Sequence, residues 1–220
     1  MKFTKDEIRS AMLLYAVTDQ MWLKEGETLA DVVESVLRNG ATFLQIREKD
    51  LAEDAFEAEA ARLKTLCARY GVPYVVNDSV EIALQCGADG VHVGQSDIQG
   101  RDIRAMIGPD KILGISAGTV AEAVAAEKAG ADYIGVGAVF ETSTKKNARH
   151  MTVAQLKEIV SSVSIPVVAI GGIGAGNLLQ LCGSGVDGVA VVSAIFAAED
   201  PGKATAKLLK LAKEMVRTNG

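Results

Sequence analysis

The sequence lacks three features that would point to particular classes of protein. Its 23 Lys and Arg are outnumbered by 28 Asp and Glu, and the net charge of −5 leaves no general basic surface for nucleic acid. No apolar run reaches membrane-spanning length, and the N-terminus has no signal-peptide core. The three cysteines, Cys67, Cys86 and Cys182, have no metal-binding spacing. We therefore expect a cytoplasmic protein with free thiols and neither a nucleic-acid nor a membrane partner.

Low-complexity segments and long linkers are also missing from the 220 residues, which predicts one domain spanning 1–220. Apolar residues, by contrast, are abundant. Hydrophobic side chains make up 49 % of the chain, and it contains 22 glycines. This composition is typical of a buried parallel sheet with many tight turns.

A short repeat marks the starts of four apolar runs. It reads Gly-Ala-Thr-Phe-Leu at 40–44, Gly-Ala-Asp-Gly-Val at 87–91, Gly-Ala-Asp-Tyr-Ile at 130–134 and Gly-Val-Asp-Gly-Val at 185–189. Each copy follows a helical segment, so we expect its glycine to end that helix and the short turn to lead into a strand. The copies are spaced as two βα units each, which predicts strands two, four, six and eight.

The odd-numbered strands are predicted at 13–17, 74–77, 112–116 and 167–170. An opening helix over 4–12 begins with a capping box of Thr4 and Glu7, and an amphipathic helix covers 28–37. Eight strands alternating with helices predict an α/β protein, a single (β/α)8 TIM barrel with a short N-terminal helix. An open doubly wound sheet is the alternative, but no G-x-G-x-x-G follows the first strand.

The chain is organised around the stretch 165–196. An apolar strand, 167–170, leads directly into Gly171, Gly172 and Gly174, and a second strand, 189–192, ends at Ser193. Backbone N–H groups at two such strand ends favour an anion, and loops seven and eight are the usual phosphate site of a TIM barrel. The alternative is that the glycines only make a tight turn.

Two cations follow the second strand. Alternation places Gln45, Arg47 and Lys49 on one side of the chain and Ile46 and Glu48 on the other. Cations at the mouth of a barrel suit a phosphate or diphosphate. A solvated charged loop is the alternative.

Two aspartates follow the third and fourth strands, Asp78 after Asn77 and Asp97 after Gly94. Neighbouring strands would bring these carboxylates together beside the cations. A shared Mg²⁺ accounts for the pair, because Mg²⁺ takes one or two carboxylates plus substrate phosphate oxygens. The alternative is helix capping, since a helical segment follows each aspartate.

Further polar groups follow the fifth and sixth strands. Ser116 ends the fifth strand, and hydroxyls and lysines occupy 142–146, within a long loop, 141–152, that we expect to act as a lid. His92, between two valines, is predicted to be a hydrogen-bonded core residue, and His150 a loop residue. No Ser-His-Asp or Cys-His arrangement is apparent, so the site is expected to move phosphate-bearing groups without a protein nucleophile.

These residues match a known family. The sequence resembles thiamin phosphate synthase, also called thiamin-phosphate pyrophosphorylase, from about Leu14 to the last helix. The resemblance is carried by Gln45-Ile46-Arg47-Glu48-Lys49, Val76-Asn77-Asp78, Val91-His92-Val93-Gly94-Gln95-Ser96-Asp97, Thr142-Ser143-Thr144-Lys145 and Ile170-Gly171-Gly172-Ile173. It implies a TIM-barrel transferase that joins 4-amino-2-methyl-5-hydroxymethylpyrimidine diphosphate to a thiazole phosphate. The products would be thiamin phosphate and pyrophosphate.

The resemblance also implies roles for individual residues. The pyrimidine diphosphate would be held by Gln45, Arg47, Lys49, Asn77, Ser116 and Lys145, of which Arg47, Lys49, Lys145 and Ser116 would be catalytic. The thiazole phosphate would be held by Thr142, Ser143, Thr144, Gly172, Val192 and Ser193. One Mg²⁺ per subunit would bind to Asp78 and Asp97. The small-molecule substrates are the expected partners, and a homo-oligomer stays open.

One position departs from the family pattern. Many relatives carry His where this chain has Gly118, which leaves the role of that histidine in doubt here. Three alternatives stay open: a non-catalytic relative that binds thiazole phosphate or thiamin phosphate, a thiazole-tautomerase-like protein, and another barrel enzyme acting on a phosphorylated substrate. A non-catalytic relative could lose its aspartates or Lys145. A thiazole tautomerase relies on the histidine that is missing here, and another barrel enzyme would need a general acid and base pair at the strand ends.

Overall fold

A computed structural model describes residues 3–48, 51–142 and 151–219. Eight parallel strands pair in sequence order and close into a barrel through β1 and β8. The strands are β1 Leu14–Val17, β2 Phe43–Ile46, β3 Tyr74–Asn77, β4 Gly90–Val93, β5 Ile112–Ala117, β6 Tyr133–Val136, β7 Val167–Ile170 and β8 Gly188–Val191. The predicted TIM barrel is confirmed, as are the even-numbered strands at the four repeats. β5 runs one residue further than predicted, and β8 lies one residue earlier.

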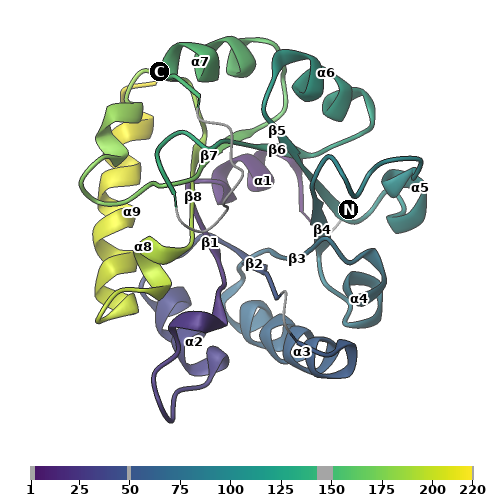
Figure 1. Cartoon of the computed structure of the whole chain (residues 1–220), viewed down its shortest axis with the longest axis vertical. Helices are drawn as coiled ribbons and strands as arrows, with labels where there is room; N and C mark the ends of the chain where they lie inside the picture. The colour runs from purple at the N-terminus through teal and green to yellow at the C-terminus, as the bar shows by residue number, and fades with distance from the viewer. Residues whose placement is uncertain (1–2, 49–50, 143–150, 220) are drawn as a thin grey trace.

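Helices α2 to α9 surround the strands, whereas α1 lies at the centre of the ring (Figure 1). The helices are α1 Lys5–Ala11, α2 Leu29–Arg38, α3 Glu53–Tyr70, α4 Val80–Gln85, α5 Ile103–Ile107, α6 Val120–Lys128, α7 Val153–Ser161, α8 Ser193–Phe196 and α9 Pro201–Arg217, with 3₁₀ turns η1 Gln20–Trp22 and η2 Leu178–Leu181. The predicted capping box of Thr4 and Glu7 begins α1. In the part of the chain that is described, no helix combines the length and apolarity needed to cross a membrane.

The barrel separates two apolar cores. The larger core lies between the outer face of the strands and the helices, where the outward-facing residues of each strand meet buried residues of the helices. The smaller core fills the barrel interior with Tyr15, Phe43, Val75, Tyr133 and their neighbours. Ile8 and Ala11 of α1, and Met12 directly after it, belong to this inner core, so α1 closes the end of the barrel where the strands begin. The opposite end is left for the site.

At that closed end, each copy of the repeat forms a hydrogen bond from its turn to the preceding strand, which we call a clamp. Its glycine adopts positive φ after the preceding helix or turn, at 101° for Gly40, 66° for Gly87, 83° for Gly130 and 84° for Gly185. The side chain two residues later accepts a backbone N–H at the start of the preceding strand. The pairs are Thr42 with Leu14 at 2.8 Å, Asp89 with Tyr74 at 3.0 Å, Asp132 with Leu113 at 2.8 Å and Asp187 with Val167 at 2.8 Å.

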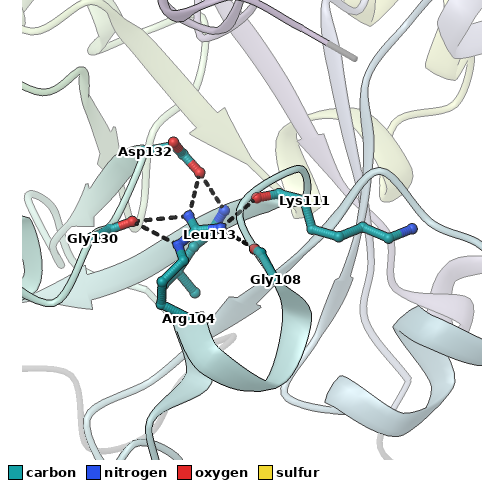
Figure 2. Close-up of polar contacts among 6 residues, drawn as sticks. All are labelled: Arg104, Gly108, Lys111, Leu113, Gly130 and Asp132. Atoms are coloured by element: carbon teal, nitrogen blue, oxygen red, sulfur yellow. Dashed lines mark hydrogen bonds and ion pairs between the residues drawn. The ribbon is translucent and has the colours of Figure 1, made fainter. Parts of the chain in front are cut away.

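Each of the three aspartates also pairs with a cation. Lys64 contacts Asp89 at 2.7 Å, and Arg9 contacts Asp187. Figure 2 shows the fullest case, in which Arg104 reaches Asp132 and also donates to the carbonyl oxygens of Gly108, Lys111 and Gly130. The clamps lie opposite the site, where residues of a TIM barrel serve stability.

Candidate active site

A cavity of about 510 Å³ lies at the carboxyl ends of the strands, and residues from all eight strands or the loops after them line it. The described residues that we expected to contact the pyrimidine diphosphate or the metal all line it: Gln45, Arg47, Asn77, Asp78, Asp97 and Ser116. So do the described residues expected to hold the thiazole phosphate: Thr142, Gly172, Val192 and Ser193. Lys49, Ser143, Thr144, Lys145 and His150 lie outside the described residues, as does most of the expected lid.

Arg47 stands at the mouth of the cavity after β2. Its backbone N–H donates to the hydroxyl of Thr18 at 3.0 Å, which ties this loop to the loop after β1. Its guanidinium pairs with Asp19 at 4.0 Å, with both side chains mostly buried. A guanidinium carries five N–H donors, so one long ion pair leaves donors for an anion in the cavity.

Asp78 ends β3 in a strained turn. Its φ of 64° is the only positive value found for a non-glycine residue among those described. The N–H of Ser79 donates to the carbonyl oxygen of Asn77 at 2.8 Å, which makes a three-residue γ-turn of the uncommon type, centred on Asp78. The Asp78 N–H itself donates to the carbonyl oxygen of His92 on β4 at 2.8 Å. Such strain is typical of functional sites.

Asp97 closes the turn after β4. Its carboxylate accepts the N–H of Gly94 at 2.8 Å, and its own N–H donates back to the Gly94 carbonyl oxygen at 3.1 Å. Helix capping, the alternative for both aspartates, is wrong. Ser79 caps α4 and Asp102 caps α5, because these are the residues directly before each helix.

The two carboxylates suit a metal that takes most of its ligands from elsewhere. No group of three or more His, Cys, Asp or Glu side chains in the described ranges could hold a metal ion by itself. Two carboxylates at one cavity, beside a cation that could bind a phosphate, match the way Mg²⁺ binds through one or two carboxylates, water and substrate phosphates.

The glycines after β7 bring two loops together. Gly171 and Gly172 have φ of 99° and 66°. A Cβ on Gly172 would lie 2.2 Å from the carbonyl oxygen of Glu141, in the loop after β6. Close backbone packing therefore requires glycine here. Ser193 begins α8 at the neighbouring strand end, and the first N–H groups of a helix have no partner within it.

The floor of the cavity holds polar residues that our sequence reasoning did not assign to the site. His92 is buried and hydrogen-bonded, as predicted, but it also lines the cavity. Its Nε2 lies 3.0 Å from the Ser116 hydroxyl, and its Nδ1 lies 2.9 Å from the Tyr133 hydroxyl. Gln95 also lines the cavity and donates to the Ser116 carbonyl oxygen at 2.6 Å. Only the pairing register of β4, β5 and β6 could have indicated these contacts, because it brings residues together that are distant in the sequence.

Glu48 follows Arg47 in the chain but does not line the cavity. Burial is the main cause that raises the pKa of its carboxyl to about 7, and the negative charges of Asp19 and Glu59 contribute to the rise. A hydrogen bond from Gln20 acts in the opposite direction and lowers the pKa. Its Oε1 is buried and has no hydrogen-bond partner among the described residues.

A closed (β/α)8 barrel with a polar cavity at the carboxyl ends of its strands is the architecture of a TIM-barrel enzyme. The family model described as thiamine monophosphate synthase matches residues 14–195. The chain therefore belongs to the thiamine monophosphate synthase family, which confirms the resemblance seen in its motifs.

Individual relatives agree with this assignment. The chain is 50 % identical over 198 residues to a thiamine-phosphate synthase of Ruminiclostridium cellulolyticum, covering 90 % of this chain and 94 % of the relative. It is 47 % identical over 197 residues to a thiamine-phosphate synthase of Methanobrevibacter smithii, covering 90 % and 93 %. The solved thiamine phosphate pyrophosphorylase of Pyrococcus furiosus superposes with a TM-score of 0.86 at 39 % identity, covering 94 % and 98 %.

Proposed function

We propose that this protein is a thiamin phosphate synthase that joins the aminopyrimidine diphosphate to the thiazole phosphate and releases pyrophosphate. The observation that carries the proposal is the convergence on one cavity of a cation, Arg47, two carboxylates, Asp78 and Asp97, and the glycine-rich end of β7. A diphosphate and a second, remote phosphate are the ligands that this set would accept together.

In the proposed reaction the C–O bond between the pyrimidine methylene and the diphosphate breaks first. The amino group of the ring stabilises the resulting cation, and negative charge builds on the departing diphosphate. Arg47 would direct its donors at that charge and bind the transition state more tightly than the ground state. Mg²⁺, when held by Asp78 and Asp97, would supply further positive charge to the same oxygens.

The thiazole nitrogen then attacks the methylene carbon. Gly172 and Ser193 would hold the thiazole phosphate far from the reacting atoms, together with Thr142 and Val192, and so fix the approach of the nitrogen. No side chain has to remove a proton from that nitrogen, so an acid–base pair is not required. Lys49, Ser143, Thr144 and Lys145 remain predictions from the family resemblance for the same two groups.

The test is an assay of the purified protein with both precursors and Mg²⁺, following pyrophosphate and thiamin phosphate together. We expect both products in equal amounts, and neither when the thiazole phosphate is omitted. Tight binding of either precursor by calorimetry without product would contradict the proposal and favour the non-catalytic alternative. Conversion of the thiazole alone to an isomer would favour the tautomerase-like one.

A further inference from the structure

Five side chains form a continuous hydrogen-bonded chain across the cavity floor. Gln45 Nε2 donates to the Tyr15 hydroxyl, which lies 2.8 Å from the Tyr133 hydroxyl. Tyr133 lies 2.9 Å from His92 Nδ1, and His92 Nε2 lies 3.0 Å from Ser116 Oγ. Four of these residues line the cavity, whereas Tyr133 does not and is fully buried. The central member of the chain therefore acts only through its neighbours.

The strand register builds this chain at one glycine. Gly114 of β5 pairs with His92 of β4 on one side and with Tyr133 of β6 on the other. A Cβ at Gly114 would lie 2.2 Å from Tyr133 Cζ and 2.6 Å from His92 Nδ1. Because Gly114 has no side chain, the rings of His92 and Tyr133 can meet above it. Three strands, β4, β5 and β6, are therefore needed for the hydrogen bond between these two rings.

The chain has a direction, because each phenol has one proton to donate. The Tyr15 oxygen accepts from Gln45, and the arrangement that gives both buried phenol protons an acceptor has Tyr15 donating to Tyr133 and Tyr133 donating to His92 Nδ1. His92 must then carry its proton on Nε2 and donate it to Ser116. Burial raises the pKa of both phenols, so both stay protonated and able to donate.

The two ends of the chain consequently present opposite groups to the cavity. Ser116 accepts from His92, and its own proton is left to point toward a ligand. Gln45 uses its amide N–H₂ on Tyr15, and its carbonyl oxygen is left as an acceptor. An aminopyrimidine edge offers the complement, a ring nitrogen that accepts and an amino group that donates. A 4-oxo analogue offers the reverse, a ring N–H and a carbonyl oxygen.

We propose that Tyr133 is a positioning residue that fixes the donor–acceptor direction of the cavity floor and so selects an aminopyrimidine over its 4-oxo analogue. The ligand assignment rests on the proposed function, whereas the direction of the chain can be tested on the ligand-free protein. Sites that hydrogen-bond a substrate group discriminate strongly against analogues that cannot match it, because buried groups are then left unpaired.

The first test is ¹⁵N NMR of histidine-labelled, ligand-free protein. The chain has two histidines, and His150→Gln removes the second one, so the remaining signals belong to His92. We expect an unprotonated, hydrogen-bonded Nδ1 and a protonated Nε2, with the Nδ1 shift moving toward that of a free nitrogen in Tyr133→Phe. A wild-type Nδ1–H tautomer overturns the proposal.

The second test is discrimination between the two pyrimidines. In Tyr133→Phe we expect the ratio of Kd values for the 4-oxo and 4-amino diphosphates to fall at least about tenfold, equivalent to one hydrogen bond, with thiazole phosphate affinity unchanged. Tyr74→Phe is the matched control, because Tyr74 is fully buried and its hydroxyl has no hydrogen-bond partner among the described residues. An unchanged ratio in Tyr133→Phe overturns the proposal.

Two arrangements keep the outcome interpretable. Should Tyr133→Phe not fold, Tyr15→Phe interrupts the chain one step earlier and should weaken the same discrimination while leaving the His92 tautomer as it is. Loss of discrimination equal to that of Tyr74→Phe would count against the inference. A wild-type protein that binds the aminopyrimidine diphosphate but forms no thiamin phosphate would refute the proposed function alone.

Discussion

Asp132 and Arg104 form a largely buried ion pair, with 2.7 Å between Oδ2 and Nη2, at the end of the barrel opposite the cavity. The same carboxylate oxygen accepts the N–H of Leu113 at 2.8 Å, at the start of β5. The pair therefore joins the turn before β6 to the strand beside it. Arg104 also donates to three carbonyl oxygens, so it keeps partners if Asp132 is removed.

We expect Asp132→Ala to lower the free energy of unfolding by about 1–3 kcal/mol, because the main loss is the partner of one buried N–H. Urea denaturation measures it. Activity per folded molecule should be unchanged, since the clamp lies away from the cavity. The control is Glu158→Ala, which removes an exposed carboxylate from α7. Equal unfolding free energies for the two variants would show that the clamp contributes nothing.

The metal proposal predicts the behaviour of two conservative variants. Asp78→Asn keeps a residue that tolerates positive φ, and Asp97→Asn keeps an acceptor for the Gly94 N–H, so each removes charge with little change of shape. We expect each to raise the Mg²⁺ concentration for half-maximal activity at least tenfold, on the order of the effect of disturbing a metal site. Titrating Mg²⁺ in the synthase assay measures it.

A double-mutant cycle then tests whether the aspartates share one ion. Losses at two ligands of one site should be non-additive, whereas independent sites add. Asp54→Asn, an exposed carboxylate on α3, is the control and should keep the wild-type requirement. An unaltered Mg²⁺ dependence in either cavity variant would rule out the shared metal.

The elements that the sequence predicts well are those set by local pattern. Apolar runs and glycine-marked turns locate each strand to within about a residue, because burial on both faces leaves no alternation to confuse the pattern. The residues at strand ends follow from the barrel itself. Asp78 and Asp97 therefore reach one cavity as expected.

Relationships set by register were harder to predict. His92 and Ser116 are 24 residues apart, and His92 and Tyr133 are 41 apart. Their contact depends on the exact pairing of β4, β5 and β6 and on the space above Gly114. The clamp role of Asp132 was missed for the same reason, since the repeat shows only that an aspartate recurs and its partners belong to other units.

The glycine-rich loop gives a prediction with a control in the same segment. Gly172→Ala should raise KM for the thiazole phosphate more than KM for the pyrimidine diphosphate. The added methyl would meet the Glu141 carbonyl oxygen, and a φ of 66° is unfavourable for alanine. The loop after β7, which is proposed to hold the thiazole phosphate, must therefore shift. Gly176→Ala should leave both KM values unchanged, because nothing lies within 4 Å of its Cβ. Equal rises in both KM values would indicate general damage to the barrel.

The last prediction concerns the pH dependence of stability at Glu48. Burial, with the charges of Asp19 and Glu59, raises the pKa of this carboxyl from 4.5 to about 7 in the folded protein. A raised folded-state pKa contributes stability that is fully present below pH 4.5 and is lost as pH rises through 7, because the folded protein binds the proton more tightly. Glu48→Gln keeps the neutral shape at every pH, so its stability relative to wild type should increase from about pH 4.5 to about pH 7, the interval that these two pKa values bound. Urea unfolding across that range measures the difference, with Glu53→Gln, an exposed carboxylate at the start of α3, as the charge-matched control. A constant difference between Glu48→Gln and wild type over the whole range would show that Glu48 titrates as it does in the unfolded chain.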